Sequence, residues 1–377
     1  MLNNLDLVLK WILKNEYFIR ELDLFSGEFF GGSLGFKVLD KIYEYAKKKK
    51  FCELITIPTN FYFISDNTLT EKVENNIKKF GEIGIDIVLS CSIDGEPIDK
   101  LSRASDSSYR NNNYYDKVFE FCKKHCYGYH PMVSTIFIDH YKENYSWWID
   151  KIIEHYGDEA KYHKPMLLEV RNDGWTKEKI SKYQDYLWFQ FEYDLEKLYK
   201  NDIEAFAQDL FNPPMVMMGN PIKLPLPCDR ITCSIQMNPA IRLGDLSLVP
   251  CHRLSYKNFI YGNFKVENNE ISGINELNTP LALKIYSMNP NVSHPRCSEC
   301  LIKYICLRGC LGSQYETTGE IFMPIDSVCE LMFTKMKTLK EIYDHYNMFN
   351  IMYKSKVISE RRKEEIKIVE DMLCQLS

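Results

Sequence analysis

The strongest constraint on the fold is a strict alternation of short apolar runs and amphipathic segments over the first 205 residues. Such alternation is typical of βα units, in which a buried strand precedes a helix that covers the sheet. Strands are expected at 21–25, 53–57, 85–92, 132–138 and 166–170. Helices are expected at 6–14, 35–49, 70–80, 114–125, 145–155 and 176–199.

This repeat begins with a helix and contains six helices but only five strands. Because βα crossovers are right-handed, units of this number close into a parallel barrel or part of one. The sequence therefore predicts an α/β fold, a partial parallel (β/α)6-type TIM barrel over 1–205 that lacks its first strand. Functional side chains are expected in the loops at the carboxyl ends of the strands.

Beyond residue 205 the sequence becomes cysteine-rich and is punctuated by proline and glycine, which predicts a small second domain over 206–335. A helical pattern then returns, and we expect a C-terminal helical extension over 336–377. The small domain is poor in regular apolar pattern, so metal binding is expected to supply much of its stability.

Composition narrows the class of protein. With 45% hydrophobic and 26% charged residues and no apolar run near 18 residues, the chain is expected to be soluble and not to enter a membrane. A net charge of -5 argues against a nucleic-acid partner. Abundant thiols without an export signal indicate a reducing, cytoplasmic setting.

Eight cysteines have the spacing of metal ligands. Cys297, Cys300, Cys306 and Cys310 fall within fourteen residues, and the other four are Cys228, Cys233, Cys251 and Cys329. Short loops bring several thiolates to one ion or cluster at low entropic cost, whereas disulfide frameworks belong to short secreted domains. Two groups of four ligands are expected. Iron–sulfur clusters and zinc, which also accepts four sulfurs, both remain open on these grounds.

Two predicted strand ends carry polar side chains beside glycine. Ser26, Gly27 and Glu28 follow the first strand, where the glycine lets a ligand approach the backbone and the carboxylate can accept from an ammonium group. After the third strand, the segment SIDGEP contains Ser92, Asp94 and Gly95, and Arg103 follows a short loop later.

The motifs together resemble a known family. Cys-x2-Cys-x5-Cys-x3-Cys with a distant fifth cysteine, preceded by LVPCHRL, resembles the radical S-adenosylmethionine enzymes with a SPASM domain, the branch that modifies peptides and proteins. Leu246 stands where that family has a glycine before its Pro-Cys. The resemblance implies one [4Fe-4S] cluster on Cys228, Cys233, Cys251 and Cys310. It implies a second on Cys297, Cys300, Cys306 and Cys329.

The barrel motifs imply a binding site for S-adenosylmethionine. FSGE is similar to the family's Gly-Gly-Glu, with Ser26 replacing the first glycine, so that Gly27 and Glu28 would hold the methionine amino group. Ser92 would contact the same cofactor, and Arg103 occupies roughly the position of a following arginine. The segment Thr59-Asn60 resembles the family's Thr-Asn-Gly, with Phe61 in place of the glycine.

One family element is missing from this sequence. The catalytic cluster is bound through Cys-x3-Cys-x2-Cys after the first strand, and the nearest imitation, Cys122, Cys126 and Tyr129, is interpreted as structural. As written, the chain is expected to be inactive in radical chemistry. Either the protein extends upstream of Met1, which the intact FSGE turn favours, or the catalytic cluster was lost. S-adenosylmethionine and a third cluster are expected only in a full-length form.

Two functions follow from the resemblance. The first is modification of a peptide or protein by hydrogen abstraction with a 5′-deoxyadenosyl radical, served by an electron donor of the ferredoxin or flavodoxin type. The second is a noncatalytic [4Fe-4S] protein that binds a peptide or relays electrons.

His252 stands where sulfatase-maturing relatives have an acidic base, which weakens a sulfatase-maturation role. It is a candidate base or a hydrogen-bonded neighbour of a cluster. Trp147, Trp148 and Trp188 are expected to be packing residues. The sequence does not indicate the oligomeric state.

Overall fold

A computed structural model describes residues 1–25, 27–102, 110, 113–169, 174–212, 221–224, 239–287, 294–306 and 310–376. The chain folds into two compact units, each assembled from segments that are distant in sequence. The first unit comprises Met1–Ser92, Asp106–Tyr127 and Ser234–Met288, and the second comprises Ile93–Ser105, Gly128–Cys233 and Asn289–Ser377. The domain boundaries expected near residues 205 and 335 stay a prediction.

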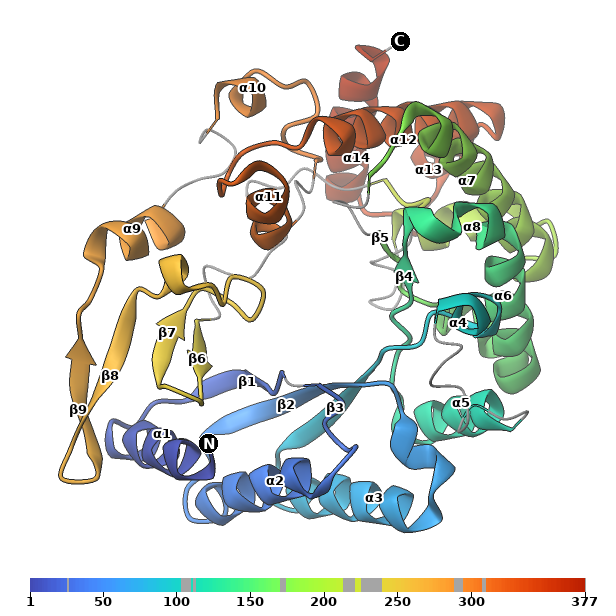
Figure 1. The fold of residues 1–377 in the computed structure, drawn as a ribbon. Coiled ribbons are helices and arrows are strands. Elements are labelled where there is room, and N and C mark those ends of the chain that lie inside the picture. The colour runs from blue at the N-terminus through green and yellow to red at the C-terminus, as the bar shows by residue number, and fades with distance from the viewer. Residues whose placement is uncertain are drawn as a thin grey trace. The chain divides into compact units, whose positions relative to one another are not determined.

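A parallel three-stranded sheet forms the centre of the first unit. Its strands lie in the order β1 (Ile19–Asp23), β2 (Cys52–Thr59) and β3 (Asp86–Cys91). The surrounding helices are α1 (Leu2–Lys14), α2 (Ser33–Ala46), α3 (Asn67–Gly81) and α5 (Tyr114–His125), with a short 3-10 turn η1 (Tyr62–Ser65). Helices α2 and α3 run along one face of the sheet (Figure 1). These elements confirm the first three strands and four of the six helices predicted from the sequence.

The alternation along β2 explains how the sheet is covered. Ile55 and Ile57 are fully buried on one face, whereas Thr56, which points the opposite way, is half-buried. Thr56 pairs with Asp23 of β1 on one side and with Val88 of β3 on the other. The carboxyl ends of the three strands therefore meet at one edge of the sheet.

A second sheet in the first unit is antiparallel. Its strands are β6 (Ala240–Arg242), β7 (Ser247–Val249), β8 (Gly262–Glu267) and β9 (Glu270–Asn275). A 3-10 turn, η7 (Lys257–Phe259), precedes β8, and helix α9 (Thr279–Ser287) follows β9.

Helix α1 packs against this antiparallel sheet. The rings of Trp11 and Phe264 lie 4.8 Å apart, and Lys14 pairs with Glu270 at 2.6 Å. Asn4 Nδ2 donates to the carbonyl oxygen of Leu243 at 2.8 Å in the β6–β7 turn. The helix that opens the βα repeat is thus joined to strands more than 220 residues later in the sequence.

The second unit is mainly helical around a short parallel pair, β4 (Met132–Val133) and β5 (Leu168–Glu169). The helices in its first part are α4 (Glu96–Ser102), η3 (Thr135–His140), α6 (Tyr141–Tyr156), η4 (Gly157–Tyr162), α7 (Lys177–Lys197) and α8 (Ile203–Phe211). Those in its last part are α10 (Pro295–Ser298), α11 (Leu311–Thr318), α12 (Asp326–His345), α13 (Met348–Lys354) and α14 (Glu360–Cys374). One continuous apolar core joins residues of α6, α7, α8, α12, α13 and α14.

The strand predicted at 132–138 is wrong beyond Val133. A 3-10 helix, η3, follows instead, because the Ser134 side chain accepts from the backbone N–H of Ile136 and so caps the turn. Ile138 packs from this turn into the core and Phe137 packs against it, whereas Ile136 is exposed. An apolar run of this length does not by itself distinguish strand from helix.

A buried ion pair lies inside the second unit. Lys164 and Asp194 of α7 are 3% and 0% exposed and form a salt bridge. Tyr145 of α6 donates its hydroxyl to Asp194 Oδ1 at 2.6 Å. Burial raises the pKa of Asp194, and the Lys164 ammonium opposes that shift. The carboxylate therefore depends on these two partners for its charge.

The fold is a mixed α/β arrangement of parallel sheets and many helices, as the alternation predicted. In the part of the chain that the structure describes, every helix is too short or too polar to cross a lipid bilayer.

Candidate functional site

Residues at the ends of three strands of the first unit are joined by hydrogen bonds. Glu28, which follows β1, accepts from Thr59 Oγ1 at 2.6 Å through Oε1 and from the backbone N–H of Asn60 at 2.8 Å through Oε2. The N–H of Ser92, which follows β3, donates to the carbonyl oxygen of Thr59 at 2.9 Å. The structure thus brings the predicted residues Glu28, Thr59, Asn60 and Ser92 together, with Gly27 directly preceding Glu28.

These hydrogen bonds fix the direction of the Glu28 carboxylate. Thr59 is 2% exposed, and its hydroxyl also accepts from the N–H of Phe61 at 3.1 Å. Glu28 itself is half-buried, so its charge is reachable from solvent. A carboxylate held in this way can accept from a cationic group without reorienting. The other two residues of the predicted cofactor site, Ser26 and Arg103, lie outside the described residues.

Two residues that stand where the resemblance expects glycine have a left-handed backbone. Phe61 has φ 59° and Leu246 has φ 59°, a conformation that costs a residue with a side chain about 1–3 kcal/mol. Phe61 is fully buried, with its ring 5.3 Å from that of Phe63. Leu246 is 6% exposed, and its N–H closes the β6–β7 turn on the carbonyl of Arg242 at 2.8 Å. Burial of a large side chain offsets the strain at both positions.

Asp23 is a titratable group at the carboxyl end of β1. Burial and the neighbouring negative charge of Glu21 raise its pKa to about 6. Glu21 in turn accepts from the hydroxyl of Thr56 at 2.7 Å. The β1 edge of the sheet therefore carries a pair of carboxyl groups on the face that bears Thr56.

Asp23→Asn is expected to change how stability depends on pH. Because the folded pKa is raised above the unfolded value near 3.8, Asp23 stabilises the fold below that pH and loses the contribution as pH rises through 6. The advantage of the variant over the parent should grow by about 1 kcal/mol between pH 4 and pH 7, allowing for screening of a half-exposed group. Urea unfolding at both pH values measures this. Asp40→Asn, an exposed carboxylate paired with Lys79 at 2.8 Å, is the control. An advantage independent of pH contradicts the assignment.

His252 lies beside the loop that follows β1. Its ring stacks on that of Phe25 at 4.0 Å with 15° between the planes. Burial and the charge of Arg253 lower its pKa, so the imidazole is neutral at pH 7. The preceding residue, Cys251, accepts from the N–H of Leu254 through its Sγ at 3.4 Å. The proposed ligands Cys228 and Cys233 lie outside the described residues, so the ligand set that includes Cys251 stays a prediction.

The SIDGEP loop begins the second unit and is held by α6. The carbonyl oxygen of Asp94 accepts from Asn144 Nδ2 at 2.8 Å and from Trp148 Nε1 at 3.1 Å. Trp147 Nε1 donates to Glu96 Oε2 at 3.1 Å. Trp148 is fully buried and packs as expected, and the indole N–H groups of Trp147 and Trp148 in addition hold this loop. Trp188 is a packing residue at the edge of the apolar core, as expected.

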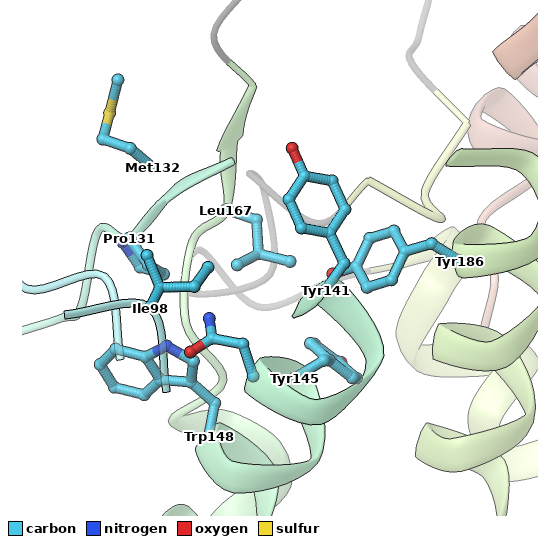
Figure 2. A pocket seen from close by; sticks show the side chains of 9 residues that line it. Ile98, Pro131, Met132, Tyr141, Tyr145, Trp148, Leu167 and Tyr186 are labelled. Carbon is cyan, nitrogen blue, oxygen red and sulfur yellow. The ribbon is translucent and has the colours of Figure 1, made fainter. Parts of the chain in front are cut away.

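A small pocket adjoins this loop. Figure 2 shows Tyr141, Tyr145 and Trp148 of α6 around it, with Met132 from the start of β4 and Tyr186 of α7. Its volume is about 10 Å³, the space of roughly one water molecule. The pocket is therefore too small to bind a substrate.

Four of the eight predicted ligands line one larger cavity in the second unit. Cys297, Cys300, Cys306 and Cys329 surround a space of about 190 Å³, and Cys310 is not among its lining residues. The remaining wall is largely apolar and includes Ile302, Leu311, Phe322, Pro324, Ile325, Val328, Met332 and Phe333, with the polar residues Arg296, Lys303 and Gln314. These four cysteines are the group that the resemblance assigns to a single cluster.

Local structure explains why the four thiols converge. Pro295 at the start of α10 sets the turn that carries Cys297, and the N–H of Cys300 donates to the carbonyl of Cys297 at 3.3 Å. Ile302 and Ile305, which are 1% and 0% exposed, anchor the following loop in the apolar core. Cys329 comes from α12, which begins before this cysteine at Asp326. Three short-range ligands and one from a distant helix thus share the cavity.

Four thiols around one cavity suit either an iron–sulfur cluster or a zinc ion. The surroundings of the cavity also act on its thiols. Burial, together with the nearby sulfurs, raises the pKa of Cys329 to about 11, while Arg296 acts in the opposite direction.

Comparison with known proteins identifies the fold. No family model matches the sequence, and no curated protein matches it. Among solved structures, anSMEcpe with bound AdoMet superposes with a TM-score of 0.57 at 13% identity, covering 97% of this chain and 88% of that chain. anSMEcpe with bound AdoMet and Cp18Cys peptide gives 0.54 at 14% identity, covering 92% of this chain and 89% of that chain. This chain therefore has the fold of anSMEcpe.

Sequence reasoning missed several residues that shape the sites. Asn144 and Trp148 hold the SIDGEP loop through side-chain donors, and Arg296 lines the cysteine cavity. Arg296 is directly next to Cys297 in sequence, which is the one signal that could have drawn attention to it.

Proposed function

We propose that this chain is an iron–sulfur protein of the radical S-adenosylmethionine and SPASM type that modifies a peptide or protein substrate. The convergence of Cys297, Cys300, Cys306 and Cys329 on one cavity is the observation that carries the proposal. The fold shared with anSMEcpe, which has been solved with AdoMet and with peptides, supports it. In this proposal the βα repeat is a partial barrel without its first strand.

The residues divide into two cluster sites and one cofactor site. Cys297, Cys300, Cys306 and Cys329 would hold one [4Fe-4S] cluster, and Cys228, Cys233, Cys251 and Cys310 would hold another. S-adenosylmethionine together with a further, catalytic cluster would supply the 5′-deoxyadenosyl radical.

This chain's own residues would bind and orient the cofactor and the substrate. Glu28 would accept from the ammonium group of the methionine moiety, and the hydrogen bonds that it accepts from Thr59 and Asn60 hold its carboxylate in position to do so. Gly27 leaves the backbone accessible, and Ser92 and Arg103 would contact the same cofactor. His252, whose pKa is lowered by burial and by Arg253, would be either a base toward the substrate or a hydrogen-bonded neighbour of a cluster. The electron donor would be a ferredoxin or flavodoxin, and the setting cytoplasmic.

Iron content tests the proposal. After anaerobic reconstitution the chain should hold about eight irons, and Cys306→Ser should lower this to about four, because a missing thiolate releases one cluster. Cys126→Ser, which removes an exposed thiol outside both ligand sets, is the matched control and should retain eight. Retention of all eight in the Cys306 variant, or zinc in place of iron, overturns the ligand assignment.

A noncatalytic [4Fe-4S] protein that binds a peptide or relays electrons is the second candidate. It is favoured by one observation, the absence of any Cys-x3-Cys-x2-Cys from the 377-residue sequence. The in-frame DNA upstream of Met1 distinguishes the two. A Cys-x3-Cys-x2-Cys encoded there supports the enzyme, and a stop codon before any such motif supports the noncatalytic protein.

A further inference from the structure

Arg296 connects the two helices that carry distant ligands of the cysteine cavity. It precedes Cys297 in α10, and its guanidinium forms a salt bridge with Asp326 in the first turn of α12, three residues before Cys329. Its backbone N–H donates to His294 Nδ1 at 3.2 Å, which fixes the start of α10. Arg296 also lines the cavity itself. The cation therefore lies beside two of the four sulfurs.

The positive charge of Arg296 would act strongly on an anionic group in the cavity, because the cavity wall around it is largely apolar. Most of the wall is apolar, and the other cation that lines it, Lys303, donates its Nζ to the carbonyl oxygen of Ser298 at 2.8 Å. A [4Fe-4S] cluster with four thiolates is anionic, and one-electron reduction adds a further negative charge. An apolar wall disfavours that added charge, whereas a nearby guanidinium favours it.

We propose that the Arg296–Asp326 pair sets the reduction potential of the cluster held by Cys297, Cys300, Cys306 and Cys329. Arg296 stabilises the reduced cluster and raises its potential, and Asp326 weakens this effect by partly neutralising the guanidinium. This inference rests on the proposed function, because it requires a cluster in this cavity. Arg296 is a positioning and tuning residue, since it acts on the cluster through its charge.

The test uses the full chain in a Cys251→Ser background, which removes the other proposed cluster and leaves one iron–sulfur signal. Four variants are compared after anaerobic reconstitution. Three change the pair at the cavity: Arg296→Gln, Arg296→Lys and Asp326→Asn. The fourth, Arg361→Gln, is a control that breaks a salt bridge away from the cavity. Arg361 pairs with Glu365 on α14 and does not line the cavity. Iron is counted first, and a potentiometric titration followed by visible absorbance then gives the midpoint potential.

Opposite signs are expected from the two members of the pair. Arg296→Gln should lower the potential and Asp326→Asn should raise it. Each should change the ratio of reduced to oxidised cluster about threefold, the scale of a largely exposed charge pair. Arg296→Lys should retain most of the parent potential, and Arg361→Gln all of it. If the salt bridge had only a structural role, Arg296→Gln and Asp326→Asn would shift the potential in the same direction, because both variants break the same salt bridge.

Each result is decisive. Four irons with unchanged potentials, or shifts of the same sign in the Arg296 and Asp326 variants, overturn the tuning role while leaving the cluster in place. Absence of iron from the parent chain in this background overturns the proposed function and the inference with it. Because iron is counted separately from the potential, the two failures are distinguishable.

Discussion

Gly95→Ala is expected to lower the free energy of unfolding by about 3 kcal/mol or more. Gly95 has φ +108°, a region that residues with a side chain rarely adopt. A Cβ there would lie 2.8 Å from Trp148 Nε1 and would collide with Asn144 Oδ1. Both side chains donate to Asp94, so moving them also breaks the hydrogen bonds that hold the SIDGEP loop.

Denaturant unfolding of the reconstituted chain measures this loss. Gly81→Ala is the matched control, because it lies in α3 and a Cβ at that position meets no atom within 4 Å. We expect the control to be neutral or slightly stabilising, since alanine favours a helix by up to about 1 kcal/mol over glycine. A loss below about 1 kcal/mol in the Gly95 variant would show that the loop can move aside without penalty.

Asp194→Ala is expected to lower the free energy of unfolding by about 3–5 kcal/mol, since it leaves a buried ammonium without a counter-ion. Lys164 is 3% exposed and would lose its salt bridge, and the Tyr145 hydroxyl would lose its acceptor at 2.6 Å. Tyr145→Phe should destabilise less, by about 1–2 kcal/mol, because the ion pair itself remains.

A double variant separates the unpaired charge from the value of the ion pair. Lys164→Met with Asp194→Leu removes both charges at similar volume and should recover most of the stability that Asp194→Ala loses, because buried ion pairs gain little over apolar packing. Urea unfolding of the single and double variants gives the coupling between the two residues. If the double variant is as unstable as Asp194→Ala, the pair contributes more than the avoidance of an unpaired charge.

The periodicity of apolar residues in the sequence predicts much of the fold. The strands near Ile55 and Leu89 and the helices that cover them follow from alternation and helical spacing, because local patterning dictates which face is buried. The prediction failed after Val133, where a single serine side chain captures a backbone donor and turns the chain into η3. Apolar patterning contains no information on that competition between side-chain and backbone hydrogen bonds.

For the candidate sites too, some features follow from the sequence and others only from the structure. Glycine positions expected from the resemblance are occupied by Phe61 and Leu246, yet the left-handed backbone is present at both. Residue type alone does not indicate this backbone conformation, because the burial that offsets the strain at each side chain is set by tertiary packing.

The sequence by itself determined the α/β class and the cysteines available as ligands, since periodicity and spacing are local properties of a chain. Spacing alone left the grouping of the cysteines open, and the tertiary structure places Cys329 from α12 with Cys297, Cys300 and Cys306 around one cavity without Cys310, the grouping that the resemblance implied. The tertiary structure also decided that Glu28 is oriented by Thr59 across two strands. Such groupings depend on how helices and strands pack, and packing is set by contacts between residues far apart in sequence.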